Sequence, residues 1–442
     1  MAQTGLLDNK TILRFSHALS GGGGVEVHID NLNRMLLSRN AVKILYLYLP
    51  EEDGVEITEE SAGRGTLVKI PLRVDRSSSV PFREGLNRYQ HNLFISFFRK
   101  TYSRFKYLNQ YVLYKAGKQM FMPYFREVSG FKEVLAGLFK EHKVDLIVNH
   151  FPGGRDSLQL MAAAAEVNIP VLIINHFDNA WFNYFPIRQQ VDRTRYVSGV
   201  TGINIPGYLR RRFINISNGV DTDYFDPWKV SFRTVSQYPV LLLPARIWPM
   251  KGHLDLLQTA HMLRSKGITC FLVFAGRCDS DSFREELYTW IKKKGMKDQV
   301  MFTGLVNHDS LRQYYRSSTL VVLPTYQEGF GRVVVEAQSM GVPPVAYDVG
   351  GLKQSLIKGK TGILVKKGDR RALCEAIEGL LKDEKRRKEM GREGRNFVER
   401  VYSLRSLVER HERVYEMIIR GEPAVKLNGM IDEEMRGHFG AT

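Results

Sequence analysis

The sequence contains few cysteines and no long apolar segment. Its 442 residues include three cysteines, Cys270, Cys278 and Cys374, and no C-x-x-C pair. Three cysteines without a paired spacing exclude a disulfide framework and favour a reducing compartment. No run of about 18 apolar residues could span a bilayer, and Met1 to Lys10 lack the basic start and apolar stretch of a signal peptide. We therefore expect a cytoplasmic protein.

Acidic residues are too few to balance the basic ones. The chain has 64 Lys and Arg against 47 Asp and Glu, a formal net charge of +17. Such an excess fits an anionic partner, which could be nucleic acid, anionic lipid or a phosphorylated substrate. The sequence has no zinc-finger spacing, no RNA-recognition signature and no recognisable helix-turn-helix, so no nucleic-acid partner is expected. A nucleic-acid-binding protein driven by charge stays open as an alternative.

The composition is that of an ordinary globular protein, with 43% hydrophobic and 25% charged residues. A chain of this length is expected to form two domains, each with its own core. Short apolar runs typical of buried strands alternate with segments of helical spacing. This alternation predicts an α/β fold with parallel sheets.

The most informative stretch runs from Pro324 to Gly351, PTYQEGFGRVVVEAQSMGVPPVAYDVGG. The apolar run before it predicts a buried strand, and Val333–Met340 is predicted to be a helix that ends at Gly341-Val-Pro-Pro. The glycine loop between them lies at the carboxyl end of a parallel strand, where open α/β sheets bind ligands. Loop amides and the helix start suit an anion, whereas Glu328 and Glu336 suit sugar hydroxyls. The alternative is a plain β/α turn with surface glutamates.

A second turn carries two cations. The strand Val240–Leu243 and the helix Leu254–Leu263 are joined by a segment that contains Arg246 and Lys251. Two cations five residues apart across a strand-to-helix turn can converge on one diphosphate, Arg as a planar fork and Lys as a point charge. The glycine run 21–24 follows the first strand in the same way, but as a bare motif it also fits a flexible turn.

Taken together, these motifs resemble one enzyme family. The stretch fits P-x3-EGFG-x4-EA-x3-G-x-P around an E-x7-E pair, and the second turn fits R-x4-K-G. GGVE at 23–26 and NGVDTDYF at 218–225 fit the start and the end of an N-terminal domain in the same family. The sequence thus resembles the GT4 family of retaining glycosyltransferases. The resemblance implies the GT-B fold, two Rossmann-like domains facing across a cleft.

The resemblance implies a role for each motif residue. Arg246 and Lys251 would hold the donor diphosphate and stabilise it as it leaves. Glu328 would contact the donor sugar and Glu336 the nucleotide ribose, and His176, after the strand Val171–Asn175, would reach the sugar. The other implied donor-site residues are Gly22, Gly23 and Gly24 near the diphosphate or acceptor, Gly276, Arg277, Gly304 and Leu305 near the base, and Gly329, Phe330, Gly331 and Arg332 through loop amides.

The resemblance also suggests how the chain is divided. We expect an acceptor-side domain at 1–225, a nucleotide-sugar domain at 226–403, a helix at 404–420 that crosses back, and a polar tail at 421–442. The donor would be a nucleotide-diphosphate sugar of the UDP or GDP type, with no cofactor and no metal. Asp221-x-Asp223 is accordingly interpreted as a turn rather than a metal motif, and Asp279-Ser-Asp281 as a helix cap.

Residues 83–132 have a different character. They contain ten Lys or Arg against two Glu, interleaved with many aromatic residues. This pattern fits an anionic membrane surface, and we hypothesise peripheral contact with the inner face of the plasma membrane. A helical pair with aromatics in its core, or a surface for single-stranded nucleic acid, fits the same pattern.

The sequence therefore predicts a hexosyltransferase-type retaining enzyme that acts on a glycan or lipid-linked acceptor, in cell-surface polysaccharide or glycolipid synthesis. Other GT-B chemistries, a phosphorylase or a nucleotide-sugar epimerase, stay open, as does a catalytically silent binding subunit. No motif for the pyridoxal lysine of a phosphorylase is recognised in the sequence, and the intact Arg246, Lys251, Glu328 and Glu336 argue against a silent subunit.

Overall fold

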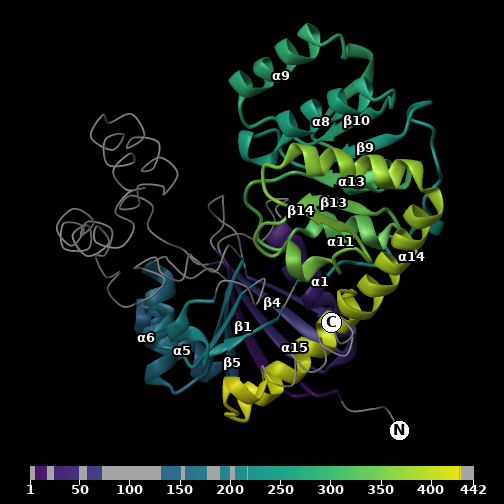
Figure 1. The fold of residues 1–442 in the computed structure, drawn as a ribbon. Helices are drawn as coiled ribbons and strands as arrows, with labels where there is room; N and C mark the ends of the chain where they lie inside the picture. Colours follow the sequence, from purple (N-terminus) through teal and green to yellow (C-terminus); the bar gives the residue numbers. More distant parts are fainter. Residues whose placement is uncertain are drawn as a thin grey trace, which may run out of the picture. The chain divides into compact units, whose positions relative to one another are not determined.

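A computed structural model gives the fold of the chain (Figure 1). The residues that it describes are 5–16, 24–48, 57–71, 131–150, 155–176, 190–199, 205–216, 218–427 and 429. Most of the basic aromatic region 83–132 lies outside these residues, as do Gly22 and Gly23. The predictions made for those residues stay predictions.

Contacts divide the chain into two compact units. The first consists of Met1–Glu26, Leu37–Ile174 and Trp181–Val197, and the second of Val27–Leu36, Asn175–Ala180 and Ser198–Thr442. The domain boundaries that the sequence suggests, at 225, 403 and 420, stay predictions.

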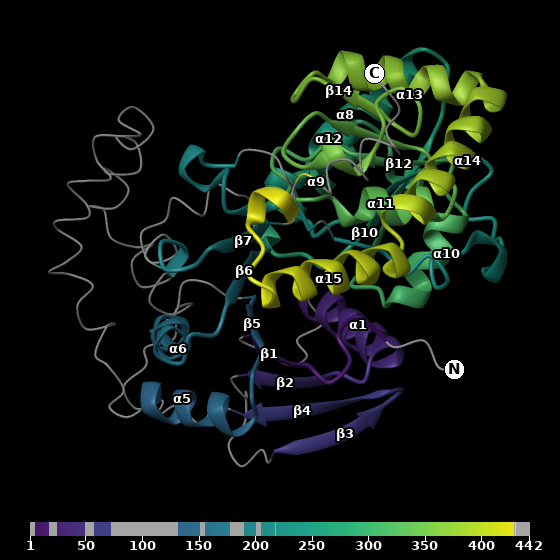
Figure 2. The same ribbon diagram turned by 90° about the horizontal axis from the view of Figure 1, so that it is seen from below.

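The first sheet has eight strands and is parallel in its centre. Its strands are β1 (Thr11–Ser16), β2 (Lys43–Tyr48), β3 (Thr58–Ala62), β4 (Gly65–Pro71), β5 (Leu146–Asn149), β6 (Val171–Asn175), β7 (Tyr196–Gly199) and β8 (Phe213–Ile214). Their order is β3-β4-β2-β1-β5-β6-β7-β8. The central strands are buried along their whole length, as expected for parallel strands covered on both faces. Figure 2 shows the exception at the edge, where β3 runs antiparallel to β4.

The helices that alternate with these strands along the chain are α1 (Gly24–Arg39), α5 (Phe131–Glu141) and α6 (Arg155–Glu166). Helices α5 and α6 pack side by side. Both follow the expected pattern in which a helix lies between consecutive parallel strands.

The second sheet has six parallel strands. They are β9 (Val240–Leu243), β10 (Phe271–Ala275), β11 (Val300–Gly304), β12 (Leu320–Leu323), β13 (Pro344–Tyr347) and β14 (Ile363–Val365), in the order β11-β10-β9-β12-β13-β14. The sequence predicted β9 with these bounds, and β12 is the buried strand predicted directly before Pro324. Strands β9, β10 and β11 follow one another toward one edge of the sheet, and strands β12, β13 and β14 follow one another toward the opposite edge. The order therefore reverses between β9 and β12, and turns after these two strands flank a topological switch point.

Eight α-helices accompany this sheet in the described residues. They are α8 (His253–Ser265), α9 (Asp281–Lys293), α10 (His308–Arg316), α11 (Arg332–Ser339), α12 (Leu352–Ser355), α13 (Arg370–Lys382), α14 (Glu384–Val401) and α15 (Leu404–Ile419). Helix α8 packs beside α13, and α11 packs beside α14 (Figure 1). Right-handed crossovers that leave in opposite directions place α8 and α11 on opposite faces of the sheet. Within the described ranges, no helix combines the length and apolar character that a bilayer span requires.

Candidate functional site

The turns after β9 and β12 are in direct contact at the switch point. The carbonyl of Met250 accepts hydrogen bonds from the backbone N–H of Tyr326 at 2.9 Å and from the hydroxyl of Thr325 at 3.1 Å. Gly252 has φ +75°, and a Cβ there would lie 1.9 Å from the carbonyl oxygen of Pro324. Only glycine allows the two turns to approach so closely.

This contact brings two predicted residues together. The ammonium of Lys251 lies 2.7 Å from Glu328 Oε2, and both side chains are largely buried, with exposed fractions of 22% and 19%. A charge-assisted hydrogen bond of this length fixes both groups at the carboxyl edge of the sheet. The second turn thus supplies a cation and the glycine loop an anion at one point.

Arg246 lies in the same turn and has a different partner. Its Nη1 donates to Asp279 Oδ2 at 2.7 Å, while Arg277 Nε donates to the other oxygen of Asp279 at 2.8 Å. The backbones of the turns after β9 and β10 are joined as well, because Ile247 N–H donates to the Arg277 carbonyl at 2.9 Å. One carboxylate therefore holds two guanidinium groups at the edge of the sheet.

The segment Asp279-Ser-Asp281 does cap α9, as predicted, but through Ser280 and not through Asp279. Ser280 is the N-cap of α9, since its hydroxyl accepts the N–H of Phe283. Asp279 lies one residue outside the helix and is free to bridge the two arginines. The sequence offered no signal for this, because Arg246 and Asp279 are 33 residues apart.

The glycine loop is held by its backbone. Gly331, the N-cap residue of α11, has φ +79°, and a Cβ on it would lie 2.2 Å from the side chain of Leu352. The carbonyl of Gly329 accepts the N–H of Gly351 at 2.8 Å. Phe330 is buried and packs edge-on against Tyr402. A Cβ on Gly331 would also lie 3.6 Å from Glu328 Cγ, so the start of α11 lies beside Glu328, and a helix N-terminus is suited to an anion.

Glu336 lies one turn into α11 and is 5% exposed. Its Oε2 accepts the hydroxyl of Tyr315 at 2.9 Å, and its Oε1 lies 3.4 Å from Arg332 Nη2. Tyr315 is fully buried at the end of α10, and burial, followed by the charge of Glu336, raises its pKa well above the usual value. The tyrosine therefore remains a hydrogen-bond donor to the carboxylate.

A buried carboxylate, Asp255, is hydrogen-bonded to the segment that leads into the glycine loop. Asp255 on α8 accepts hydrogen bonds from the hydroxyls of Tyr326 at 2.7 Å and Tyr347 at 3.0 Å. Arg370 lies 3.4 Å from its other oxygen. Because Tyr326 is two residues before Glu328, this network anchors the glycine loop to the helix that follows Lys251.

His253 begins α8 directly after the Lys251 turn and is fully buried. Its ring stands edge-on to Phe274 at 5.0 Å between ring centroids. Burial lowers the pKa of His253 to about 3, and the nearby charge of Lys251 acts in the same direction. The imidazole is therefore neutral at ordinary pH and belongs to the support of the turn.

The remaining predicted residues have the following places. Gly276 follows β10, where a Cβ would lie 2.2 Å from the carbonyl oxygen of Ala245. Gly304 ends β11 with φ +68°, and Leu305 after it is strongly exposed. His176 directly follows β6 and is half-buried, and Gly24 is the first residue of α1. The roles of all these residues stay predictions.

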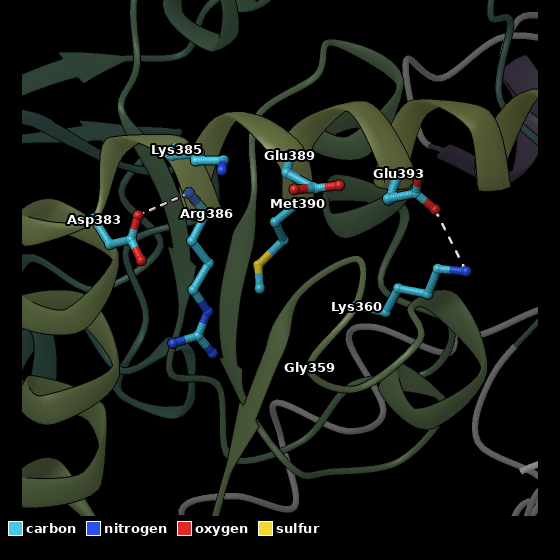
Figure 3. A pocket seen from close by; sticks show the side chains of 8 residues that line it. All are labelled: Gly359, Lys360, Asp383, Lys385, Arg386, Glu389, Met390 and Glu393. Carbon is cyan, nitrogen blue, oxygen red and sulfur yellow. Dashed lines mark hydrogen bonds and ion pairs between the residues drawn. The ribbon is translucent and has the colours of Figure 1, made fainter.

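Metal-binding groups and other pockets were also considered for the described residues. Across the described ranges, no group of three or more His, Cys, Asp or Glu side chains could hold a metal ion. Figure 3 shows a pocket of about 750 Å³ where Lys360 pairs with Glu393 at 3.4 Å and Asp383 caps α14. It has equal numbers of acidic and basic residues and none of the motif residues. Its lining residues are Gly359, Lys360, Asp383, Lys385, Arg386, Glu389, Met390 and Glu393.

The part of the chain that carries the candidate site is similar in sequence to known proteins. Residues 225–397 match the family model described as glycosyl transferases group 1. The capsular polysaccharide biosynthesis glycosyltransferase CapM of Staphylococcus aureus is 33% identical over 177 residues, which is 40% of this chain and 45% of CapM. A D-inositol 3-phosphate glycosyltransferase of Arthrobacter sp. (strain FB24) is 35% identical over 188 residues, 39% of this chain and 43% of that enzyme. The chain thus matches less than half of the length of these relatives.

Solved structures match nearly the whole chain. A glycosyltransferase from Rickettsia africae has a TM-score of 0.66 at 17% identity, covering 94% of this chain and all of that one. A sucrose-phosphate synthase from Thermosynechococcus elongatus has a TM-score of 0.67 at 18% identity with the same coverage. At these identities the likeness shows the fold, which is the GT-B fold of two Rossmann-like α/β domains that the sequence predicted. Residues 225–397 thus match the group 1 glycosyltransferases, the GT4-type family that the motifs of the chain resemble.

Proposed function

We propose that this chain is a retaining glycosyltransferase that transfers a hexosyl group from a nucleotide-diphosphate sugar to a glycan or lipid-linked acceptor. The observation that carries the proposal is the pairing of Lys251 with Glu328 beside the start of α11. A cation and helix-start amides suit the diphosphate, and a carboxylate at the same point suits the sugar hydroxyls.

Each proposed phosphate-binding cation is paired with a carboxylate, Lys251 with Glu328 and Arg246 with Asp279. A diphosphate carries more negative charge than a single carboxylate and can take over both cations. Donor binding would then free Glu328 from Lys251 and make its oxygens available to the sugar.

The proposed chemistry centres on the leaving diphosphate. As the bond between the anomeric carbon and the phosphate oxygen breaks, negative charge grows on the diphosphate. Lys251, Arg246 and the amides of the Gly329–Arg332 loop would stabilise that charge in a fixed geometry. The acceptor hydroxyl attacks the anomeric carbon from the same face, and its proton passes to the departing phosphate oxygen. No covalent enzyme intermediate forms in this step, and the sugar keeps its configuration at the anomeric carbon.

The names of similar proteins support the substrate class. CapM acts in capsular polysaccharide biosynthesis, and a structural neighbour, HepE of Anabaena, is described in complex with UDP and glucose. We extend this to a UDP- or GDP-type donor, no cofactor, and a role in cell-surface polysaccharide or glycolipid synthesis. We further propose a cytoplasmic enzyme that reaches the inner face of the plasma membrane through residues 83–132.

Ligand-induced stabilisation tests the proposal first. UDP, GDP, ADP and their sugar adducts are added to the full chain, and the Tm is measured, because a ligand that binds only the folded state raises it. One diphosphate should raise the Tm more than the others, and the matching sugar adduct should transfer its sugar with retention at the anomeric carbon, as followed by NMR.

Other results would overturn the proposal. No response to any nucleoside diphosphate excludes the donor site, and an inverted product excludes the retaining step. Sugar phosphate formed from glycan and free phosphate would identify a phosphorylase, and conversion of the nucleotide sugar without an acceptor an epimerase.

A further inference from the structure

The buried hydroxyl of Tyr315 is the nearest hydrogen-bond donor to the carboxylate of Glu336 among the contacts described above. It donates to Glu336 Oε2 at 2.9 Å, and its other contact, with the carbonyl of Val333, is longer at 3.4 Å. An O–H···O⁻ hydrogen bond is among the stronger and more directional interactions in a protein. At the opposite oxygen, Arg332 is 3.4 Å away and makes a weaker contact. The orientation of the carboxylate is therefore determined mainly by Tyr315.

The tyrosine ring is itself fixed. It stands edge-on to Phe225, with ring centroids 6.0 Å apart. The backbone of Phe225 is held in turn, since its carbonyl accepts the hydroxyl of Ser339 on α11 at 2.8 Å. Tyr315 is completely buried, so its ring has no room to change rotamer. A rigid donor thus aims at Glu336 from a neighbouring helix.

Glu336 keeps acceptor capacity on the side away from Tyr315. An ionised carboxylate has about four lone-pair directions, and the hydroxyl of Tyr315 occupies one on Oε2. Since Tyr315 stays protonated, it can only donate to Glu336, and Glu336 stays available as an acceptor. The family resemblance implies that this carboxylate contacts the nucleotide ribose, whose vicinal diol presents two donors.

We propose that Tyr315 is a positioning residue that orients Glu336 to accept the ribose hydroxyls of the donor, and that this pair sets a preference for ribonucleotides over deoxyribonucleotides. This inference rests on the proposed function, because it needs a nucleotide in the site. It adds a residue to which neither the motifs nor the comparisons assign a role, and a specificity that can be measured separately from catalysis.

The test compares UDP and GDP with their 2′-deoxy and 3′-deoxy forms, by calorimetry on the full chain. Wild type should bind the ribonucleotide about tenfold or more tightly, as expected when a buried carboxylate loses a hydroxyl partner. Y315F should lose most of this ratio, through weaker binding of the ribonucleotide and little change for the deoxy forms. E336Q should lose the ratio too, and Y315F/E336Q should be no worse than E336Q alone, because the tyrosine acts through the glutamate.

Y224F is the matched control. Tyr224 is also a tyrosine whose hydroxyl donates to a carboxylate, Asp309 Oδ1, at 2.7 Å. It should keep the ribose preference. Tyr315→4-aminophenylalanine keeps an N–H donor at the same place, so it should retain part of the preference. It also provides a folded test protein if Y315F does not fold.

The outcomes separate the two proposals. If neither diphosphate binds wild type, the donor site itself is absent. If wild type prefers the ribonucleotide and Y315F shows the same ratio, the proposed function stands and the role of Tyr315 is wrong. A Tyr315→4-aminophenylalanine protein with no more preference than E336Q would overturn it as well.

Discussion

The ammonium of Lys251 and the carboxylate of Glu328 form an ion pair at 2.7 Å. Their motifs lie 77 residues apart, and the switch point between β9 and β12 brings them together. A diphosphate at this point would exchange one anionic partner of Lys251 for another. The cation proposed to face the leaving group is thus held at a defined position, which is the condition for electrostatic preorganisation.

Replacing Lys251 should therefore slow transfer more than it weakens binding. In K251A the charge that builds on the leaving diphosphate loses its buried counter-charge. We expect a barrier higher by about 2.7–4 kcal/mol, or a kcat lower by about 10²–10³-fold. The measurement is steady-state transfer with the donor found by thermal shift. K266A removes a Lys–Glu pair of similar length, Lys266 with Glu378 at 2.6 Å, and should keep wild-type kcat. Equal rates for K251A and wild type would rule out the proposed role.

Asp279 should act against nucleotide binding. It holds Arg246 and Arg277 with one carboxylate, so D279N leaves both cations without a charged partner. The expected result is up to about fivefold tighter binding of the nucleoside diphosphate, since Arg246 is largely exposed and such pairs contribute about 0.2–1 kcal/mol. The gain should shrink as salt is added.

Calorimetric titration at two ionic strengths measures the effect of D279N. D281N is the control, because Asp281 pairs with Arg284 at 2.9 Å on the exposed face of α9 and should leave affinity unchanged. Weaker binding by D279N would show that Asp279 positions the arginines rather than competing for them.

The sequence predicted β9 with its observed bounds because VLLL is a short, uninterrupted apolar run. It did not predict β3, whose residues TEESA are polar and mostly exposed. An edge strand of this kind has no apolar pattern, and its pairing with β4 depends on the turn that joins them.

The same contrast holds at the candidate site. Arg246, Lys251, Glu328 and Glu336 were found because their spacing within short motifs is distinctive. Asp255, Asp279 and Tyr315 were not, and each makes its contact with a residue more than 20 positions away. Partners of this kind are determined by the packing of separate elements, which a local pattern does not encode.

Acid should destabilise the second unit through His253. The folded-state pKa of His253 is lowered to about 3, chiefly by burial, whereas an unfolded histidine titrates near 6.5. Below about pH 6.5 the unfolded chain takes up a proton that folded His253 does not. The stability is therefore fully present above that pH and falls as the pH drops toward 3, by about 1.4 kcal/mol per unit.

Urea unfolding between pH 7 and pH 4 tests this contribution. In H253N the histidine part of the slope should disappear, so the gap in unfolding free energy between wild type and variant narrows as the pH falls. Parallel profiles for H253N and wild type would contradict the prediction.

Replacing Gly252 by alanine should destabilise the protein more than the same change at Gly359, a second glycine with positive φ. Both Gly252 and Gly359 have positive φ, +75° and +80°, so alanine costs about 1–2 kcal/mol of backbone strain at either position. At Gly359 a Cβ meets nothing within 4 Å, whereas at Gly252 it meets the Pro324 carbonyl oxygen at 1.9 Å. We therefore expect G252A to be about 1–3 kcal/mol less stable than G359A. Moving the turns apart should also weaken binding of the nucleoside diphosphate in G252A alone, because Lys251 is its neighbour. Denaturant unfolding and calorimetry of the two variants measure both effects, and equal stability with equal affinity would show that the close approach of the two turns is not required.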